Sequence, residues 1–316
     1  MGKGTVRPRF LFYFYSMDVT KRAYLELHFS VFLWGFTAIL GDLIQLSALV
    51  LVWWRVLITP VSLFFLLRSF RVFRAMPGKL VLQFMGIGVL VALHWLAFYG
   101  AIKLANASVA LICMATASFF TALLEPLLLR QRMKGYELFL GILIIPGMAL
   151  IANNLDFSML TGFWAGLAAA LLAATFSTLN KKLIARAEPV PITFLELGSS
   201  WIFLTLMLPF FIRANPATGF WPTWTDLAYL MVLSLLCTTL PYVLSLRALK
   251  HLSAFAANLT INLEPVYGIA LAWIILKENE ELSSGFYFGV LIILVAVFSY
   301  PIVKKKVEKL SAGAKL

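Results

Sequence analysis

Long apolar runs recur along the chain and are separated by short stretches that carry charges, prolines or glycines. A helix that crosses a bilayer needs about 20 mostly apolar residues. Such runs lie near residues 24–42, 48–68, 79–101, 104–130, 136–153, 161–180, 191–213, 226–247, 251–276 and 284–303. Because the connections between the runs are short, the pattern predicts an all-α polytopic membrane protein with ten transmembrane helices and no soluble insert.

The composition supports the same class. Soluble proteins carry about 25% charged residues, whereas this chain of 316 residues carries 13% and is 62% hydrophobic. Cys113 and Cys237 fall inside apolar runs and form no CxxC pair, so neither a disulfide framework nor a zinc site is expected. The three histidines lie on different segments and indicate no metal site.

The distribution of Lys and Arg predicts the orientation, because these residues are retained on the cytoplasmic side. With the N-terminus inside, 22 of the 26 basic residues fall in inner segments, three in outer loops, and Arg55 inside a span. We therefore expect a multi-pass protein of the bacterial cytoplasmic membrane with both termini cytoplasmic. The net charge of +12 then reflects topology and contact with anionic membrane lipids. No nucleic-acid partner is expected, since such a groove interleaves aromatic residues with a basic patch.

The ends of the chain lie outside the apolar runs. The stretch “RPRFLFYFYSM” has an apolar run of about seven residues, which is short for the core of a signal peptide, and it lacks a small-residue cleavage site. Met17 is a natural start for the membrane domain, so residues 1–16 are expected to be dispensable. We assign residues 1–23 to a cytoplasmic N-terminal extension and residues 304–316 to a basic cytoplasmic tail.

Two parts of the chain resemble each other. The stretches “YGAIKLANASVALICMATASFF” and “LRALKHLSAFAANLTINLEPVY” align when Lys103 is set on Lys250, an offset of 147 residues. Earlier, “FLWGFTAIL” aligns with “LLAATFSTL” at an offset of 139. The chain therefore divides into two five-helix repeats, residues 24–153 and 161–303. Because five is odd, the repeats are inverted in the membrane, a plan that recurs in secondary transporters.

The stretch “LKHLSAFAANLTINLEPVYGIALAWIILKE” resembles the ninth-span signature of EamA-type proteins of the drug/metabolite transporter superfamily. The resemblance extends over both repeats and includes the “WG” at Trp34–Gly35. The first repeat departs from the pattern, with Ser118 where a proline is expected and Gln131 where an acidic residue is expected. The resemblance implies a secondary carrier, commonly an exporter of amino acids or other small metabolites, with a cavity between the repeats.

Glu264 lies about a dozen residues from either end of its span, near the midplane of the bilayer. An ionisable group there costs about 2.5–3.5 kcal/mol and by default faces a cavity or a partner. Helical periodicity puts Thr260, Glu264 and Tyr267 on one side, with Asn258 and Asn262 roughly opposite. Protein or water, rather than lipid, must surround this helix. Glu264 either binds a cationic group or cycles protons, or it is a buried carboxylate that fixes helix packing.

Two further ionisable residues lie at a depth from which they could reach Glu264. Arg55 is about 10 Å from the outer end of its span, and His94 is at a similar depth. Arg55 could instead bind a substrate carboxylate with its planar guanidinium, or extend outward to the interface. His94 is either a hydrogen-bonded structural residue or part of a proton relay. Glu264, Arg55 and His94 are thus the candidates for proton coupling or for an ion pair.

Other polar residues have structural interpretations. Ser118, Thr121 and Glu125 share one side of the fourth span, and Glu125 is expected to pair with Arg130 or another inner-loop cation. Glu196 lies near the cytoplasmic end of its span and is expected at the interface. Several aromatic residues could form cavity walls or only interfacial packing, among them Tyr242. The candidate substrate-binding residues are Trp34, His94, Trp95, Tyr99, Ser118, Asn258, Asn262, Glu264 and Tyr267.

We therefore expect a secondary transporter that moves a small organic metabolite, such as an amino acid, by alternating access around a midplane cavity. Export is favoured on the resemblance, and a proton is the candidate coupling ion. The chain has no phosphate-binding loop, HExxH or GxSxG motif, so neither a cofactor nor a catalytic residue is predicted. The alternative is a membrane-embedded lipid- or metabolite-modifying enzyme. A monomer and a homodimer are both compatible with the sequence.

Overall fold

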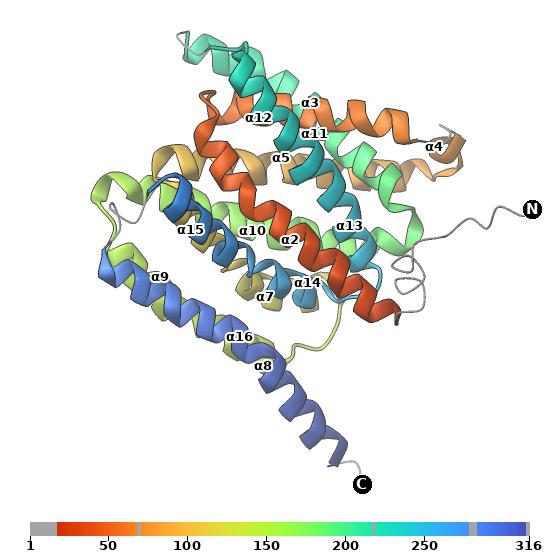
Figure 1. The fold of residues 1–316 in the computed structure, drawn as a ribbon. Helices are drawn as coiled ribbons and strands as arrows, with labels where there is room; N and C mark the ends of the chain where they lie inside the picture. The colour runs from red at the N-terminus through yellow and green to blue at the C-terminus, as the bar shows by residue number, and fades with distance from the viewer. Residues whose placement is uncertain (1–17, 68–70, 217–218, 278–282, 314–316) are drawn as a thin grey trace, which may run out of the picture.

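The computed structural model describes residues 18–67, 71–216, 219–277 and 283–313. Residues 1–17, which include most of the predicted N-terminal extension, and Glu278 of the ninth-span motif lie outside the described residues. The helices, shown in Figure 1, are α2 (Val19–Leu43), α3 (Ala48–Leu66), α4 (Arg71–Ala75), α5 (Gly78–Leu104), α6 (Ala107–Met114), α7 (Ala117–Leu129), α8 (Gly135–Ile142), α9 (Ile144–Asn153), α10 (Leu160–Leu183), α11 (Pro189–Ala214), α12 (Trp224–Ser234), α13 (Leu240–Leu249), α14 (Ala254–Ile261), α15 (Glu264–Ile275) and α16 (Ser284–Gly313).

These helices confirm the predicted architecture. In the described part of the chain, nine segments are long and apolar enough to cross a membrane, and α16 adds a shorter apolar stretch, Ser284–Ala296. Four spans are interrupted rather than continuous. The pairs α6–α7, α8–α9 and α14–α15 each form one span with a break, and a π-helix, Leu235–Thr239, joins α12 to α13. The protein is thus an all-helical polytopic membrane protein.

The fourth and ninth spans have the same local design. Asn106 caps α6 by accepting a hydrogen bond from the backbone of Val109 at 2.9 Å, and Ser253 caps α14 by accepting one from Ala256 at 3.1 Å. A polar side chain at this position satisfies a backbone N–H that has no helical partner. The sequence offset of 147 that relates Asn106 to Ser253 also relates the two breaks, Ala115–Thr116 and Asn262–Leu263. The repeat in the sequence is therefore a repeat in helix structure.

Counterpart helices of the two repeats make equivalent contacts. Helix α2 packs on α13 and α15, and its counterpart α10 packs on α5 and α7. Likewise α6 contacts α15 while α7 contacts α14. Helix α2 begins where α13 ends, as Glu26 and Arg247 form an ion pair of 3.3 Å. Helix α10 also ends there, because Lys181 donates to the carbonyl of Leu249 at 2.8 Å. The counterparts α2 and α10 thus run in opposite directions, as inverted repeats require.

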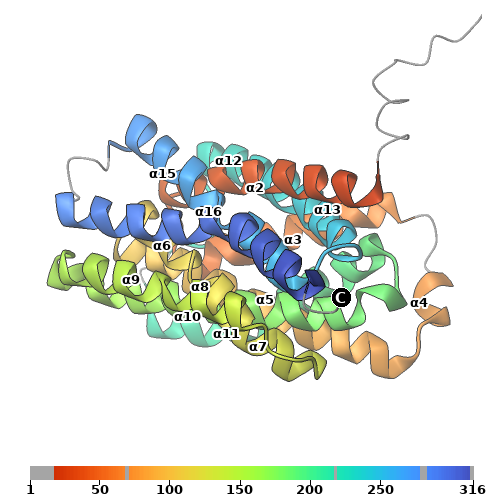
Figure 2. The ribbon, with the colours of Figure 1, turned by 90° about the horizontal axis from the view of Figure 1, so that it is seen from below.

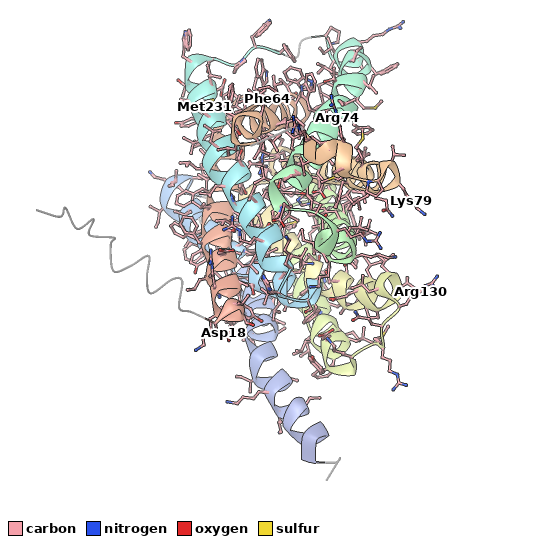
Figure 3. The ribbon with its side chains drawn as sticks, turned by 90° about the vertical axis from the view of Figure 1, so that its right-hand side faces the viewer. Asp18, Phe64, Arg74, Lys79, Arg130 and Met231 are labelled. Atoms are coloured by element: carbon pink, nitrogen blue, oxygen red, sulfur yellow. The ribbon has the colours of Figure 1, made fainter. Side chains whose placement is uncertain are left out.

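Figure 3 looks onto this end of the bundle, where Asp18, Arg74, Lys79 and Arg130 lie. All four belong to segments that the distribution of Lys and Arg along the sequence assigns to the same side of the membrane. We call it the basic end of the bundle.

The last helix of each repeat packs against the other at close range. Figures 1 and 2 show α16 lying along α8 and α9 at the side of the bundle. A Cβ atom added to Gly147 would lie 2.9 Å from the carbonyl oxygen of Gly289 and 2.8 Å from Cγ1 of Ile293. Small residues allow two helices to approach this closely. Lipid is as apolar as the side chains, so the hydrophobic effect does not drive helices together in a membrane, and close packing contributes instead.

This contact predicts different effects for two glycine substitutions. Gly147→Ala should destabilise the protein by about 1–3 kcal/mol, because the added methyl forces α9 away from α16. Gly198→Ala is the matched control, since its Cβ would meet no heavy atom within 4 Å, and alanine stabilises a helix by up to about 1 kcal/mol relative to glycine. Thermal unfolding in detergent checks both. Equal melting temperatures for the two variants would contradict the packing argument.

Candidate functional site

A cavity lies between the two repeats. It contains about 940 Å³ of space, including solvent at its mouth. Both repeats contribute to its walls, from α2, α3, α5, α6 and α7 of the first and from α10, α13, α14 and α15 of the second.

Equivalent positions of the two repeats line the same cavity. At the offset of 147, Trp95 corresponds to Tyr242, and all the residues of the following pairs are lining residues: Trp95 and Tyr242, Phe98 and Ser245, Met114 and Ile261, Ala117 and Glu264. At the offset of 139, Trp34 corresponds to Ala173 and Thr37 to Phe176, and these also line it. The cavity therefore lies on the approximate twofold axis that relates the repeats.

The cavity extends toward the basic end of the bundle. On α13 its lining runs to Leu249, the last residue of that helix, and on α2 it runs from Leu27 to Thr37. At the opposite end the helices are joined. Lys103 donates to the carbonyls of Asp42 and Ile44, and the backbone of Gln45 donates to Asp226 at 2.8 Å. The lining of the cavity thus extends toward the basic end, while hydrogen bonds between helices close the opposite end.

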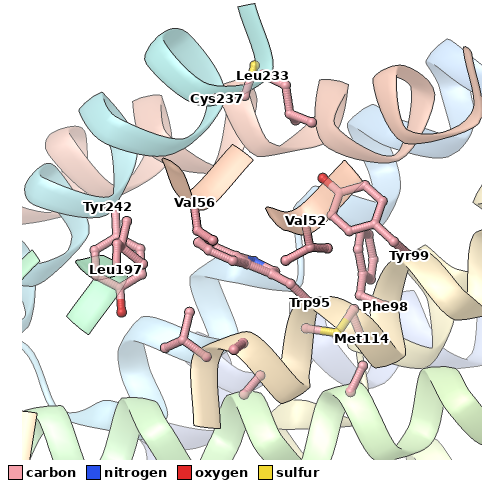
Figure 4. Close-up of a cluster of buried hydrophobic side chains, with 14 of the residues drawn as sticks. Val52, Val56, Trp95, Phe98, Tyr99, Met114, Leu197, Leu233, Cys237 and Tyr242 are labelled. Atoms are coloured by element: carbon pink, nitrogen blue, oxygen red, sulfur yellow. The ribbon is translucent and has the colours of Figure 1, made fainter. Parts of the chain in front are cut away.

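Arg55 lies deep in this cavity. Its side chain is 2% exposed, so the expectation that it extends outward to the interface is wrong. Nε donates to Thr238 at 2.7 Å and Nη1 to the Tyr99 hydroxyl at 2.6 Å, while the guanidinium carbon lies 4.0 Å above the Trp95 ring. Figure 4 shows Trp95 between Tyr242 and the pair Phe98 and Tyr99. Hydrogen bonds and a cation–π contact thus hold a buried cation in a fixed orientation.

Arg55 and Glu264 face the same cavity without a direct bond. Both are lining residues, and their charges interact. The ion pairs formed by the described residues do not include this one. Thr37 lines the same cavity, and its hydroxyl donates to the carbonyl oxygen of Trp34 at 2.7 Å. The basic and the acidic side chain thus enter the cavity lining from two different helices, α3 and α15.

His94 has a defined hydrogen bond. Its Nδ1 lies 2.9 Å from the carbonyl oxygen of Ala169, and a carbonyl can only accept, so Nδ1 carries the proton. The ring also packs against Phe98 and Phe176. His94 faces the cavity, but one of its nitrogens is committed to α10.

A line of hydrogen bonds joins α7 to α14 from the basic end to the midplane. Glu125 accepts from the backbone N–H groups of Ala254, at 3.2 Å, and Phe255, at 2.6 Å. Next along the helices come the bond of Asn258 to Thr121, 2.7 Å, and that of Asn262 to Ser118, 2.9 Å. The expected pairing of Glu125 with Arg130 is wrong. The carboxylate instead accepts from backbone N–H groups at the start of α14, which have no acceptor within their own helix.

Comparison with known proteins assigns the family. The sequence profile described as the EamA-like transporter family matches residues 21–153 and again residues 160–300. This chain belongs to the EamA-like transporter family. Of 24 chains of known structure that match, one, described only as the crystal structure of a protein, has a TM-score of 0.67. It is 14% identical in sequence, and the match covers 91% of this chain and 99% of that one. The curated proteins contain no match.

The structure places the predicted site residues of this EamA-like transporter in three groups. Those lining the cavity are Trp34, His94, Trp95, Asn258 and Glu264, together with Arg55. Those buried behind the lining are Tyr99, which binds Arg55, and Ser118 and Asn262, which bind each other. Tyr267 lies elsewhere, 38% exposed, with its ring against Phe32. Glu264 and Tyr267 both lie on α15, where a spacing of three residues separates their directions by about 60°, so Tyr267 turns to α2 while Glu264 faces the cavity.

Other cavity residues of this transporter were not singled out from the sequence. They are Phe98, Phe176, Ser177, Asn180 and Ser245, with smaller apolar residues between them. The repeat offers a signal for two of the smaller lining residues, because the offset of 139 relates Trp34 to Ala173 and the offset of 147 relates Glu264 to Ala117. Glu196 is a further correction. It is fully buried rather than interfacial and binds Tyr242 and Asn180.

The contact of Glu125 with α14 predicts the effect of Glu125→Gln. An amide offers one acceptor oxygen, so one of the two backbone N–H groups loses its partner at a cost of about 1–3 kcal/mol. The matched control is Glu188→Gln, because the Glu188 side chain is 77% exposed in its ion pair with Lys250, and such pairs contribute about 0–1 kcal/mol. Thermal unfolding in detergent should show a lower melting temperature for Glu125→Gln only. A matching loss in both variants would contradict the role of Glu125 as a cap.

Proposed function

We propose that this EamA-like transporter is a secondary carrier that moves a small organic metabolite across the bacterial cytoplasmic membrane by alternating access. The observation that carries this proposal is the cavity lined by equivalent positions of two inverted repeats and closed at one end. Exchanging the conformations of two such repeats would open the cavity to the other side while leaving its centre in place.

The chemistry of the cavity supports an amino acid or a related zwitterion as the substrate. Arg55 offers hydrogen-bond donors to a carboxylate, and Glu264 offers an acceptor to an ammonium group. Trp34, Trp95 and Phe98 line the same cavity and can cover an apolar side chain. The two charges enter the cavity lining from different helices, so a substrate that carries both charges satisfies both at once.

Orientation and direction follow from the charges at the two ends. The excess of Lys and Arg at the basic end favours a cytoplasmic location for that end and for both termini. The cavity would then face the cytoplasm, ready to load a solute for export. We propose a proton as the coupling ion. The assignment to a family of transporters favours a carrier over a membrane-embedded enzyme.

The carrier function predicts counterflow. Proteoliposomes that contain the purified protein and an unlabelled solute should accumulate the same labelled solute from outside, without any energy source. A panel of labelled amino acids and nucleosides tests the substrate class, and the expected result is accumulation of one or more amino acids. Empty liposomes are the control. If no solute accumulated under any gradient, the carrier proposal would be wrong.

If Arg55 binds the carboxylate of the substrate and Glu264 binds its ammonium group, substitution of each residue should weaken the binding of different solutes. Arg55→Gln should weaken binding of an amino acid by about 10–100-fold, the equivalent of a hydrogen bond to a charged group at about 1.5–3 kcal/mol. It should leave binding of the corresponding amino acid amide unchanged, since that solute has no carboxylate. Glu264→Gln should weaken binding of both solutes, but not of the deaminated acid.

Competition with the labelled substrate in the counterflow assay measures these affinities. Lys103→Gln is the control, because this cation is engaged at the closed end, outside the cavity lining. An equal loss for all solutes in both variants would show that the two charges serve packing rather than substrate binding.

A further inference from the structure

A second carboxyl group lies one layer behind the cavity wall. Glu196 is the eighth residue of α11, about 10 Å along the helix from its start. Its side chain is 0% exposed and does not line the cavity. The two side chains that bind it, Tyr242 from α13 and Asn180 from α10, both do. Glu196 is thus separated from the cavity by two polar side chains.

The close approach of α5 to α11 seals the other side of Glu196. Gly88 lies against the carbonyl of Glu196, where a side chain would not fit. The Ser200 hydroxyl donates to the carbonyl of Gly88 at 2.6 Å, and the Ser199 hydroxyl donates to that of Met85 at 2.9 Å. On the side of the carboxyl group, Asn180 and Tyr242 connect Glu196 to the cavity.

No cation neutralises Glu196 within the described part of the chain. The ionisable groups on the helices around it are Arg55 on α3, Lys79, His94, Tyr99 and Lys103 on α5, Lys181 and Lys182 on α10, and Tyr242 and Arg247 on α13. Of these, only Tyr242 contacts Glu196. Arg247 binds Glu26, Lys181 and Lys182 bind backbone carbonyls, and Lys79 and Lys103 lie at the ends of α5. A carboxylate buried without a counter-charge is costly, so this conformation favours the neutral acid.

The partners of Glu196 can serve either protonation state. Asn180 Nδ2 lies 3.3 Å from Glu196 Oε2, and a half-turn of the amide puts its oxygen there instead. The amide N–H then donates to a carboxylate, or the amide oxygen accepts from a carboxylic acid. Asn180 Oδ1 and Glu196 Oε1 have no hydrogen-bond partner in the described part of the structure. The site can thus gain or lose a proton without a change of fold.

We propose that Glu196 is a proton-binding site of the transporter, loaded and unloaded through Asn180 and Tyr242 from the cavity. The proposal rests on the carrier function proposed above and assigns its coupling proton to a residue outside the cavity lining. Tyr242 connects the two sites, because its ring packs on Trp95, 6.3 Å between centroids, and Trp95 supports Arg55. A substrate that moves Trp95 would therefore disturb the hydrogen bond to Glu196.

Infrared difference spectroscopy of the purified protein tests the site without any transport assay. A pH titration of the wild type should reveal the C=O stretching band of a protonated carboxyl group. Glu196→Gln should remove that band, while Glu264→Gln and the exposed control Glu188→Gln should retain it. Tyr242→Phe, which keeps the carboxyl group but removes a hydrogen-bond donor, should shift the band to higher frequency. If Glu196→Gln and Tyr242→Phe both left the spectrum unchanged, Glu196 would not be the proton site.

Transport in proteoliposomes then tests coupling. Glu196→Gln should retain counterflow but lose the acceleration of uptake by a pH gradient, whereas Glu264→Gln should weaken substrate binding and keep the pH response. A pH response that survived in Glu196→Gln would overturn the coupling role. The absence of counterflow in the wild type would instead refute the carrier function. The infrared result would still decide whether Glu196 binds a proton.

Discussion

Hydrocarbon offers no hydrogen bonds, so each polar group in the membrane must be satisfied inside the protein. This constraint accounts for the positions of the four ionisable side chains discussed above. Arg55 is bound by Tyr99 and Thr238, Glu125 by the start of α14, and Glu196 by Tyr242 and Asn180. Glu264 opens onto the cavity. Three of the four have their partners on other helices, and these bonds hold the bundle together while leaving one charge of each sign facing the cavity.

The duplicated architecture and the chemistry of the site come from different features of the sequence. The cavity reflects the symmetry of the repeats, because equivalent positions such as Trp95 and Tyr242 both line it. Divergence between the repeats supplies the polarity, since the position equivalent to Glu264 is Ala117. The seam between α7 and α14 is polar, whereas α6 and α15 meet through Leu111 and Gly268. Symmetric helices thus carry an asymmetric set of functional groups.

The sequence alone determined the spans, the repeats and the family of this protein. A span is recognisable because lipid imposes a local rule: about 20 apolar residues in a row cross the bilayer wherever they occur. The repeat was visible for a similar reason, since the offset that aligns Lys103 with Lys250 also aligns the helix caps Asn106 and Ser253. Placing Glu264 toward a cavity followed from the cost of a charge at the midplane.

Only the tertiary structure decided which groups meet. Glu125 caps a helix that begins more than a hundred residues later, and Glu196 binds residues of two other helices; no local pattern encodes either contact. Tyr267 follows Glu264 by three residues on α15 yet lies outside the cavity, because its direction differs by about 60° and its ring packs against Phe32 of α2. Hydropathy is a property of each segment by itself and can be read from residues in order. The partner of a buried charge depends on how segments distant in the chain pack, and that is fixed only when the repeats come together.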